Sequence, residues 1–112
     1  MKKIEAIIRE ERLPIVLASL REMGYPGITI SRVKGHGRQK GIKQIYREVE
    51  YTVEFLPKTR IEMIVDDADV EKIMKAIAEN ARTGAVGDGK IWATTVDALM
   101  RVRTGETGTA AI

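Results

Sequence analysis

The stretch from Thr83 to Trp92, "TGAVGDGKIW", places Gly84, Gly89 and Lys90 at the spacing G-x-x-x-x-G-K. A Walker-type phosphate-binding loop begins this way, but it also needs Ser or Thr after the lysine, a strand before the loop and a helix after it. Here Ile91 follows the lysine. The flanking patterns predict the reverse order, a helix before the loop and a strand after it. The stretch is therefore not a Walker loop.

The glycines and the lysine in this stretch still favour anion binding. Glycine allows backbone N–H groups to converge on an anion without a side chain in the way, and lysine adds a mobile point charge. The same residues also suit a simple glycine-rich turn that ends a helix and opens a strand. On these residues alone, a phosphate cradle of another architecture and a plain turn both remain open.

A second basic group lies near the end of the chain, in "RVRTGE". The segment follows a predicted strand and is expected to be extended, which places Arg101 and Arg103 on the same side, because alternate residues of an extended chain share a face. Guanidinium groups suit phosphate because they are planar forks with several donors. The alternative is a solvated basic edge with no ligand.

A long segment, "KGHGRQKGIKQIYREVE", lies between Val33 and Tyr51 and has three glycines and five Lys or Arg residues. Connections of this length are uncommon in small domains, and we expect the segment to project from the fold. Its glycines flank basic residues, which suits anion contact, although an insertion without a role is the alternative. Tyr46 and Tyr51 are candidate partner anchors, and Tyr51 could instead begin the returning strand.

The surrounding patterns predict the elements that position these segments. Apolar residues recur at helical spacing in two stretches, and short alternating or β-branched runs predict strands. The resulting order is β-α-β-β-α-β, an α+β ferredoxin-like fold with a four-stranded antiparallel sheet and both helices on one face. The predicted strands are 2–8, 28–33 and 90–96, with two successive alternating runs at 50–57 and 59–66 before the second helix, and the predicted helices are 13–23 and 70–81.

Composition restricts the classes of function. The 112 residues suffice for one domain, 1–112, and the absence of cysteine with a single histidine excludes a thiolate or a histidine-based zinc site. A net charge of +3 from 19 basic and 16 acidic residues describes a mixed surface, so charge gives no reason to expect nucleic acid as a partner. The N-terminus has no long apolar run, and we expect a cytoplasmic protein.

Three stretches together, "GRQKG", "TGAVGDGKIW" and "RVRTGE", resemble the PII nitrogen-regulatory signal-transduction proteins over essentially the whole chain. "YREVEY" in the long segment and "FLPK" after it add to the resemblance. It implies a ferredoxin-like homotrimer that binds ATP or ADP in clefts between subunits, and 2-oxoglutarate beside Mg-ATP. It also implies a signalling T-loop at 36–54, a B-loop at 82–90 and a C-terminal loop at 101–106.

The resemblance assigns nucleotide contacts by position. The phosphates would be held by the B-loop, by the base of the T-loop and by two arginines of the neighbouring subunit. Other positions match the adenine end, where Glu62 could equally be an outward strand carboxylate. The implied nucleotide-binding residues are Gly37, Arg38, Gln39, Gly87, Asp88, Gly89, Lys90, Arg101 and Arg103 around the phosphates, Thr29, Glu62 and Ile64 at the adenine end, and Lys58.

The remaining implied roles concern the effector and the targets. The 2-oxoglutarate site would comprise Gln39, Lys40, Gly41 and Lys58, with Mg²⁺ held by ATP, 2-oxoglutarate and Gln39. Arg47 matches the arginine that docks on ammonium transporters, with glutamine synthetase or a nitrogenase-type target as alternatives. Tyr51 matches a tyrosine that is uridylylated or adenylylated in many members.

The resemblance predicts a sensor and not an enzyme, since no residue stands out as a dedicated base for ATP hydrolysis. The alternative from another class is a ferredoxin-like RNA-binding module that uses the basic segment. It is disfavoured because the predicted strands lack the paired aromatics that such sheets use for base stacking. Two departures from the family pattern are His36 and Trp92, which occupy positions where phenylalanine is common.

Overall fold

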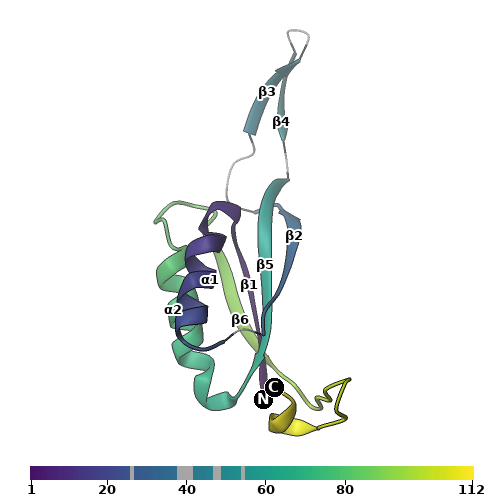
Figure 1. Cartoon of the computed structure of the whole chain (residues 1–112). Coiled ribbons are helices and arrows are strands. Elements are labelled where there is room, and N and C mark those ends of the chain that lie inside the picture. Colours follow the sequence, from purple (N-terminus) through teal and green to yellow (C-terminus); the bar gives the residue numbers. More distant parts are fainter. Residues whose placement is uncertain (26, 38–41, 47–48, 54) are drawn as a thin grey trace.

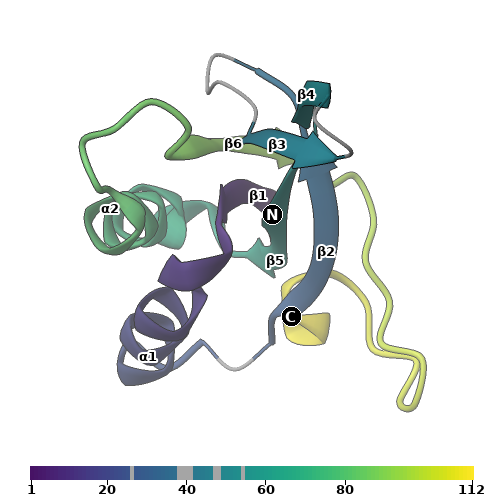
Figure 2. The same ribbon diagram turned by 90° about the horizontal axis from the view of Figure 1, so that it is seen from above.

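The computed structural model describes residues 1–25, 27–37, 42–46, 49–53 and 55–112. Four strands form one antiparallel sheet in the order β2-β5-β1-β6. Both helices cover the same face of this sheet (Figures 1 and 2). The sheet is built from β1 (Lys2–Arg9), β2 (Thr29–Gly35), β5 (Leu56–Val65) and β6 (Gly89–Thr95), and the helices are α1 (Leu13–Glu22) and α2 (Val70–Ala81). The predicted α+β ferredoxin-like fold is confirmed.

The core lies between the sheet and the helices because the strands alternate in polarity. Every second residue of β1 from Ile4 to Ile8 is buried, and β5 alternates in the same way from Thr59 to Val65. The helices contribute residues at three- and four-residue spacing. The fully or almost fully buried residues are Ile4, Ala6 and Ile8 of β1, Ile61, Met63 and Val65 of β5, Val16 and Leu20 of α1, and Ile73, Ile77 and Ala81 of α2.

The strands next to the long segment differ from the prediction. The expected strand at 50–57 is instead divided: β4 (Val49–Val53) pairs with β3 (Ile42–Tyr46) in a separate two-stranded sheet, while β5 already begins at Leu56. The expected runs 50–57 and 59–66 are not separate strands at their junction, because Pro57 lies within β5, beyond Lys58, the last β5 residue that pairs with β1. A missing N–H is tolerated where one side of the ladder has ended.

The β3–β4 hairpin extends from the end of the main sheet, as Figure 1 shows. It makes the chain elongated, with principal extents of 60 × 27 × 21 Å. The prediction of a projecting segment is therefore confirmed, and the segment contains a hairpin that the broken alternation of its sequence did not reveal.

Short 3-10 turns connect several elements: η1 (Glu10–Arg12) leads into α1, η2 (Asp67–Asp69) leads into α2, and η3 (Gly108–Ala111) lies near the C-terminus. The side chain of Asp66 accepts a hydrogen bond from the Ala68 N–H (3.2 Å) and so caps η2. No helix within the described part of the chain is both long and apolar enough to cross a membrane.

Candidate functional site

A pocket of about 760 Å³ lies between the end of β2, the start of β5 and the loop that joins α2 to β6. Six of the predicted nucleotide-binding residues line it: Gly37, Lys58, Gly87, Asp88, Gly89 and Lys90. Ile7, His36 and Trp92 add apolar and aromatic surface to the same pocket. The pocket thus combines cationic groups and glycine backbone with an apolar wall.

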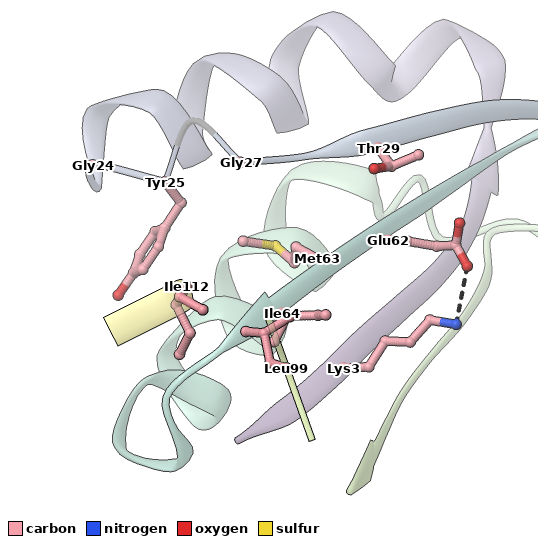
Figure 3. Close-up of a pocket in the computed structure, with 11 residues that line it drawn as sticks. Lys3, Gly24, Tyr25, Gly27, Thr29, Glu62, Met63, Ile64, Leu99 and Ile112 are labelled. Atoms are coloured by element: carbon pink, nitrogen blue, oxygen red, sulfur yellow. Dashed lines mark ion pairs between the residues drawn. The ribbon is translucent and has the colours of Figure 1, made fainter. Parts of the chain in front are cut away.

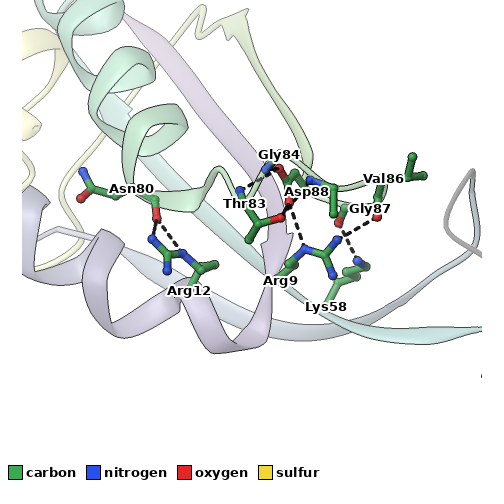
Figure 4. A network of polar contacts seen from close by, with 10 residues as sticks. Arg9, Arg12, Lys58, Asn80, Thr83, Gly84, Val86, Gly87 and Asp88 are labelled. Atoms are coloured by element: carbon green, nitrogen blue, oxygen red, sulfur yellow. Dashed lines mark hydrogen bonds and ion pairs between the residues drawn. The ribbon is translucent and has the colours of Figure 1, made fainter.

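The loop between α2 and β6, which we call the glycine loop (residues 82–89), is closed by the carboxylate of Asp88. This carboxylate accepts hydrogen bonds from the N–H groups of Thr83 and Gly84, both at 2.8 Å, and from the Thr83 hydroxyl (Figure 4). The Thr83 hydroxyl, the Arg9 guanidinium and the two N–H groups hold the pKa of the Asp88 carboxyl well below its usual range. The side chain of Asp88 is therefore engaged by its own loop and by Arg9.

Two cations bind the carbonyl groups of the loop. Arg9 Nη2 donates to the Val86 carbonyl at 2.8 Å, and Lys58 Nζ donates to the Gly87 carbonyl at 2.7 Å. Lys58 is only 8% exposed, and burial, aided by the nearby charge of Arg9, lowers its pKa. Both carbonyls thus point toward the cations.

The orientation of these carbonyls fixes the orientation of the N–H groups. The peptide bonds are trans, so the N–H of each peptide points opposite to its C=O. The N–H groups of Gly87 and Asp88 therefore point away from Arg9 and Lys58. The loop has positive φ at Gly84, Gly87 and Gly89, which allows the tight path that such an N–H cradle requires.

Gly89 is required for a second reason. A Cβ atom at this position would overlap the main-chain carbonyl of Ile7 on the neighbouring strand β1. No such obstacle exists at Gly84, where a Cβ would meet nothing within 4 Å. The glycine at 89 thus allows the loop to enter β6 directly against β1.

The three residues predicted for the adenine end lie elsewhere. Thr29, Glu62 and Ile64 line a second pocket of about 770 Å³, which also includes Tyr25 and Ile112 (Figure 3). Glu62 forms an ion pair with Lys3, with 3.1 Å between Lys3 Nζ and Glu62 Oε1. Glu62 is thus a strand carboxylate that both lines the pocket and is paired.

The two arginines predicted to bind phosphate, Arg101 and Arg103, lie in the C-terminal loop, apart from both pockets. The prediction of an extended segment is wrong: residues 102–104 form a turn, closed by a hydrogen bond from the Gly105 N–H to the Arg101 carbonyl (2.8 Å). Arg101 pairs with Glu106 at 2.9 Å and donates to the Ile112 carbonyl at 3.0 Å, whereas Arg103 is exposed. Figure 2 shows this loop on the side of the sheet away from the helices. Neither arginine lines either of the two pockets described above.

The remaining predicted residues belong to the long segment. Arg38, Gln39, Lys40, Gly41 and Arg47 lie outside the described residues. Tyr51 lies within β4. Among the residues that the structure does describe, no group of three or more His, Asp or Glu side chains could hold a metal ion.

Sequence reasoning missed Arg9 and Thr83, which organise the glycine loop. Arg9 lies 79 residues before Asp88 in the chain, so no local pattern connects them. One pattern in the sequence could have indicated Arg9. Ile4, Ala6 and Ile8 of β1 are buried against the helices, so Arg9, at an odd-numbered position, lies on the opposite face of the sheet.

Comparison with known proteins assigns the chain to a protein family. The family profile described as "Nitrogen regulatory protein P-II" matches residues 1–106. The chain therefore belongs to the P-II nitrogen regulatory protein family.

Individual relatives agree with this assignment. The chain is similar to "Nitrogen regulatory protein P-II 1" of Methanothermobacter thermautotrophicus, with 53% identity that covers 100% of this chain and 97% of the relative. It is also similar to proteins named "Nitrogen regulatory protein P-II" from Azospirillum brasilense (51%) and Rhodospirillum rubrum (50%), in both cases over the full length of both chains.

Proposed function

We propose that this chain is a cytoplasmic sensor that binds ATP or ADP, and 2-oxoglutarate beside Mg-ATP, and that it regulates nitrogen assimilation through its projecting segment. The names of its relatives describe regulatory proteins and thus favour a sensor over an enzyme. The observation that carries the proposal is the glycine loop, whose carbonyls are held by Arg9 and Lys58 so that its N–H groups face away from them. Such a cradle suits a phosphate group.

The pocket beside this loop has the chemistry that a nucleotide requires. Lys58 and Lys90 supply positive charge at the glycine loop, while Ile7 and Trp92 supply an apolar surface. Small-molecule sites commonly combine an apolar lining with a few polar groups that fix orientation. Gln39, Lys40, Gly41 and Lys58 are the residues we assign to 2-oxoglutarate, with Gln39 also assigned to Mg²⁺.

We further propose that the working unit is a homotrimer with sites shared between copies. The predicted site residues line two different pockets of one chain, and Arg103 lines neither. A second copy that places its Thr29 pocket and its C-terminal loop beside the glycine loop of the first copy would bring all three groups together. Neither α1 nor α2 covers the other face of the sheet, and the C-terminal loop lies on that side, where a second copy could reach it (Figure 2).

Isothermal titration calorimetry tests the ligand assignment. The wild-type protein is titrated with ATP, with ADP, with 2-oxoglutarate in the presence and absence of Mg-ATP, and with a pool of RNA. We expect binding of both nucleotides, binding of 2-oxoglutarate only beside Mg-ATP, and no heat from RNA. Binding of RNA without binding of nucleotide would instead support an RNA-binding module.

For the target, we propose an ammonium transporter, with Arg47 as the docking residue; glutamine synthetase or a nitrogenase-type enzyme would be the other outcomes of a pull-down. Arg47→Ala should abolish co-purification with the transporter and leave ATP affinity unchanged, because Arg47 lies in the T-loop and outside the predicted phosphate contacts. Mg-ATP with 2-oxoglutarate should release the wild-type complex, since an effector shifts a population only by its differential affinity for the two states. A complex that persists at saturating 2-oxoglutarate would contradict this mechanism.

A further inference from the structure

Arg9 lies at the end of β1 and is bonded to the glycine loop at two points. Its Nε is 3.0 Å from Asp88 Oδ1, and its Nη2 is 2.8 Å from the Val86 carbonyl oxygen (Figure 4). The side chains of Arg9 and Asp88 are only 14% and 24% exposed. A sheltered ion pair of this kind is screened less by salt than a pair on the open surface.

Asp88 transmits this contact to the beginning of the loop. Its other carboxylate oxygen accepts from the N–H groups of Thr83 and Gly84, each at 2.8 Å. The pKa of Asp88 is lowered, so the carboxylate is charged at neutral pH. Through Asp88, both ends of the loop are thus connected to the guanidinium of Arg9, which belongs to the last residue of β1.

The neighbouring lysine completes the arrangement from β5. Lys58 binds the Gly87 carbonyl, which is the next carbonyl after the one that Arg9 binds. Both interactions turn main-chain oxygen toward the sheet cations and main-chain N–H away from them. An arginine is suited to its part because its planar fork reaches two acceptors at once, which a lysine ammonium on a flexible stem does less well.

We propose that Arg9 is a positioning residue for the phosphate site: through Asp88 and Val86 it holds the glycine loop in the conformation that presents its N–H groups to a phosphate. The ligand in this inference rests on the function proposed above. The competing explanation is that Arg9 attracts the phosphate directly as a positive charge. The two explanations make opposite predictions for Asp88, because removal of a carboxylate near a bound phosphate strengthens direct attraction but dismantles the loop contacts.

A double-mutant cycle on ATP affinity distinguishes them. The variants are Arg9→Gln, Asp88→Asn and the double variant, and Arg32→Gln is the control, because Arg32 has a 91% exposed side chain and a long, 3.9 Å pair with Glu10. We expect each single variant to bind ATP about tenfold more weakly, and the double variant no more than about twofold below the weaker single variant. The control should bind as the wild type does. Additive losses of about a hundredfold in the double variant, or tighter binding by Asp88→Asn, would overturn the proposal.

Arg9→Lys separates the effect of charge from the effect of geometry, because lysine keeps the positive charge but lacks the planar, forked guanidinium. It should recover less than half of the loss caused by Arg9→Gln on a logarithmic scale of affinity. Full recovery of ATP affinity would show that charge alone suffices and would overturn the positioning role.

Hydrogen exchange of the Thr83 and Gly84 amides, without nucleotide, tests the loop independently of the ligand. Both amides donate to Asp88, so Arg9→Gln should accelerate their exchange at least about fivefold while the core amides of β1 and β5 stay protected. Unchanged exchange would overturn the role of Arg9. Failure of the wild-type protein to bind ATP would overturn the proposed function instead, so the two failures are distinguishable.

Discussion

The glycine loop and the C-terminal loop both carry predicted phosphate-binding groups, yet they differ in how they are bonded to the rest of the chain. The glycine loop is held to the sheet by Arg9, Lys58 and Asp88 and lines a pocket. The C-terminal loop is closed mainly on itself, by Arg101 and Glu106, and it exposes Val102 almost completely (99%). One loop is organised against the body of its own chain, whereas the other presents its tip to the surroundings.

This difference bears on how the site that we propose to be shared between copies would be assembled. A preformed cradle needs no ordering when the ligand arrives, which lowers the entropic cost of binding. A loop that projects from its own chain is suited to reach a neighbour. The comparison therefore predicts that substitutions in the glycine loop act within one copy, and that substitutions in the C-terminal loop act on the site of another copy.

The largest expected effect comes from Gly89, where the loop meets β1. Gly89→Ala should lower the free energy of unfolding by at least about 3 kcal/mol more than Gly84→Ala, because both residues have positive φ but only position 89 would collide with the Ile7 carbonyl. Urea denaturation monitored by circular dichroism measures the difference. Equal stability of the two variants would mean that the loop does not press against β1.

A smaller effect is expected for the lysine at the end of the loop. Lys90→Ala should weaken ATP binding by about 1.5–3 kcal/mol, the usual contribution of a hydrogen bond to a charged group. Lys75→Ala serves as the control with the same change of charge, since Lys75 lies on α2 with a 75% exposed side chain. If both variants bind ATP as the wild type does while remaining folded, the glycine loop is only a turn.

The smallest expected effect is the pH dependence of stability that comes from Asp88, the carboxylate that closes the glycine loop. The pKa of Asp88 is lowered in the folded protein, so its contribution to stability is present above the unfolded pKa of about 3.9 and is lost as the pH falls toward the folded pKa. The stability advantage of the wild type over Asp88→Asn should therefore shrink as the pH is lowered from about 5 to about 2. Urea denaturation at several pH values measures it, and an advantage that is constant over this range would contradict the charged pairing.

The sequence was sufficient for the regular elements whose periodicity is strong. The helix at 70–81 was predicted with the bounds that the structure has, because its apolar residues recur at three- and four-residue spacing. The division of 50–66 into runs at 50–57 and 59–66 was wrong, because the chain leaves β4 at Val53 and begins β5 at Leu56. The start of β5 depends on its pairing with β2 and β1 across the whole sheet. Local patterns do not contain that information.

The candidate site shows the same limit. Gly89 was identified from its spacing to Gly84 and Lys90, and Gly87 from the family resemblance; the structure places both on one pocket. The contacts of Arg9 with Asp88 could not be predicted, since they join residues that only the antiparallel order of β1 and β6 brings together. The turn at Arg101 was missed because its closure depends on Glu106 and on the position of the last residues.

The shared site is tested most directly by mixing two defective chains. Lys90→Ala impairs the cradle and Arg103→Ala impairs the projecting loop; Lys90 is preferable to Gly89 for this purpose, because substitution at 89 also disrupts β1. If the two groups come from different copies, trimers mixed at random from equal amounts should contain about one quarter intact sites, since half the cradles and half the projecting loops are normal. Calorimetry should then detect ATP sites of wild-type affinity in trimers whose mixing is verified by native mass spectrometry. The absence of any such sites would contradict the account, because it would place both groups in the site of a single chain.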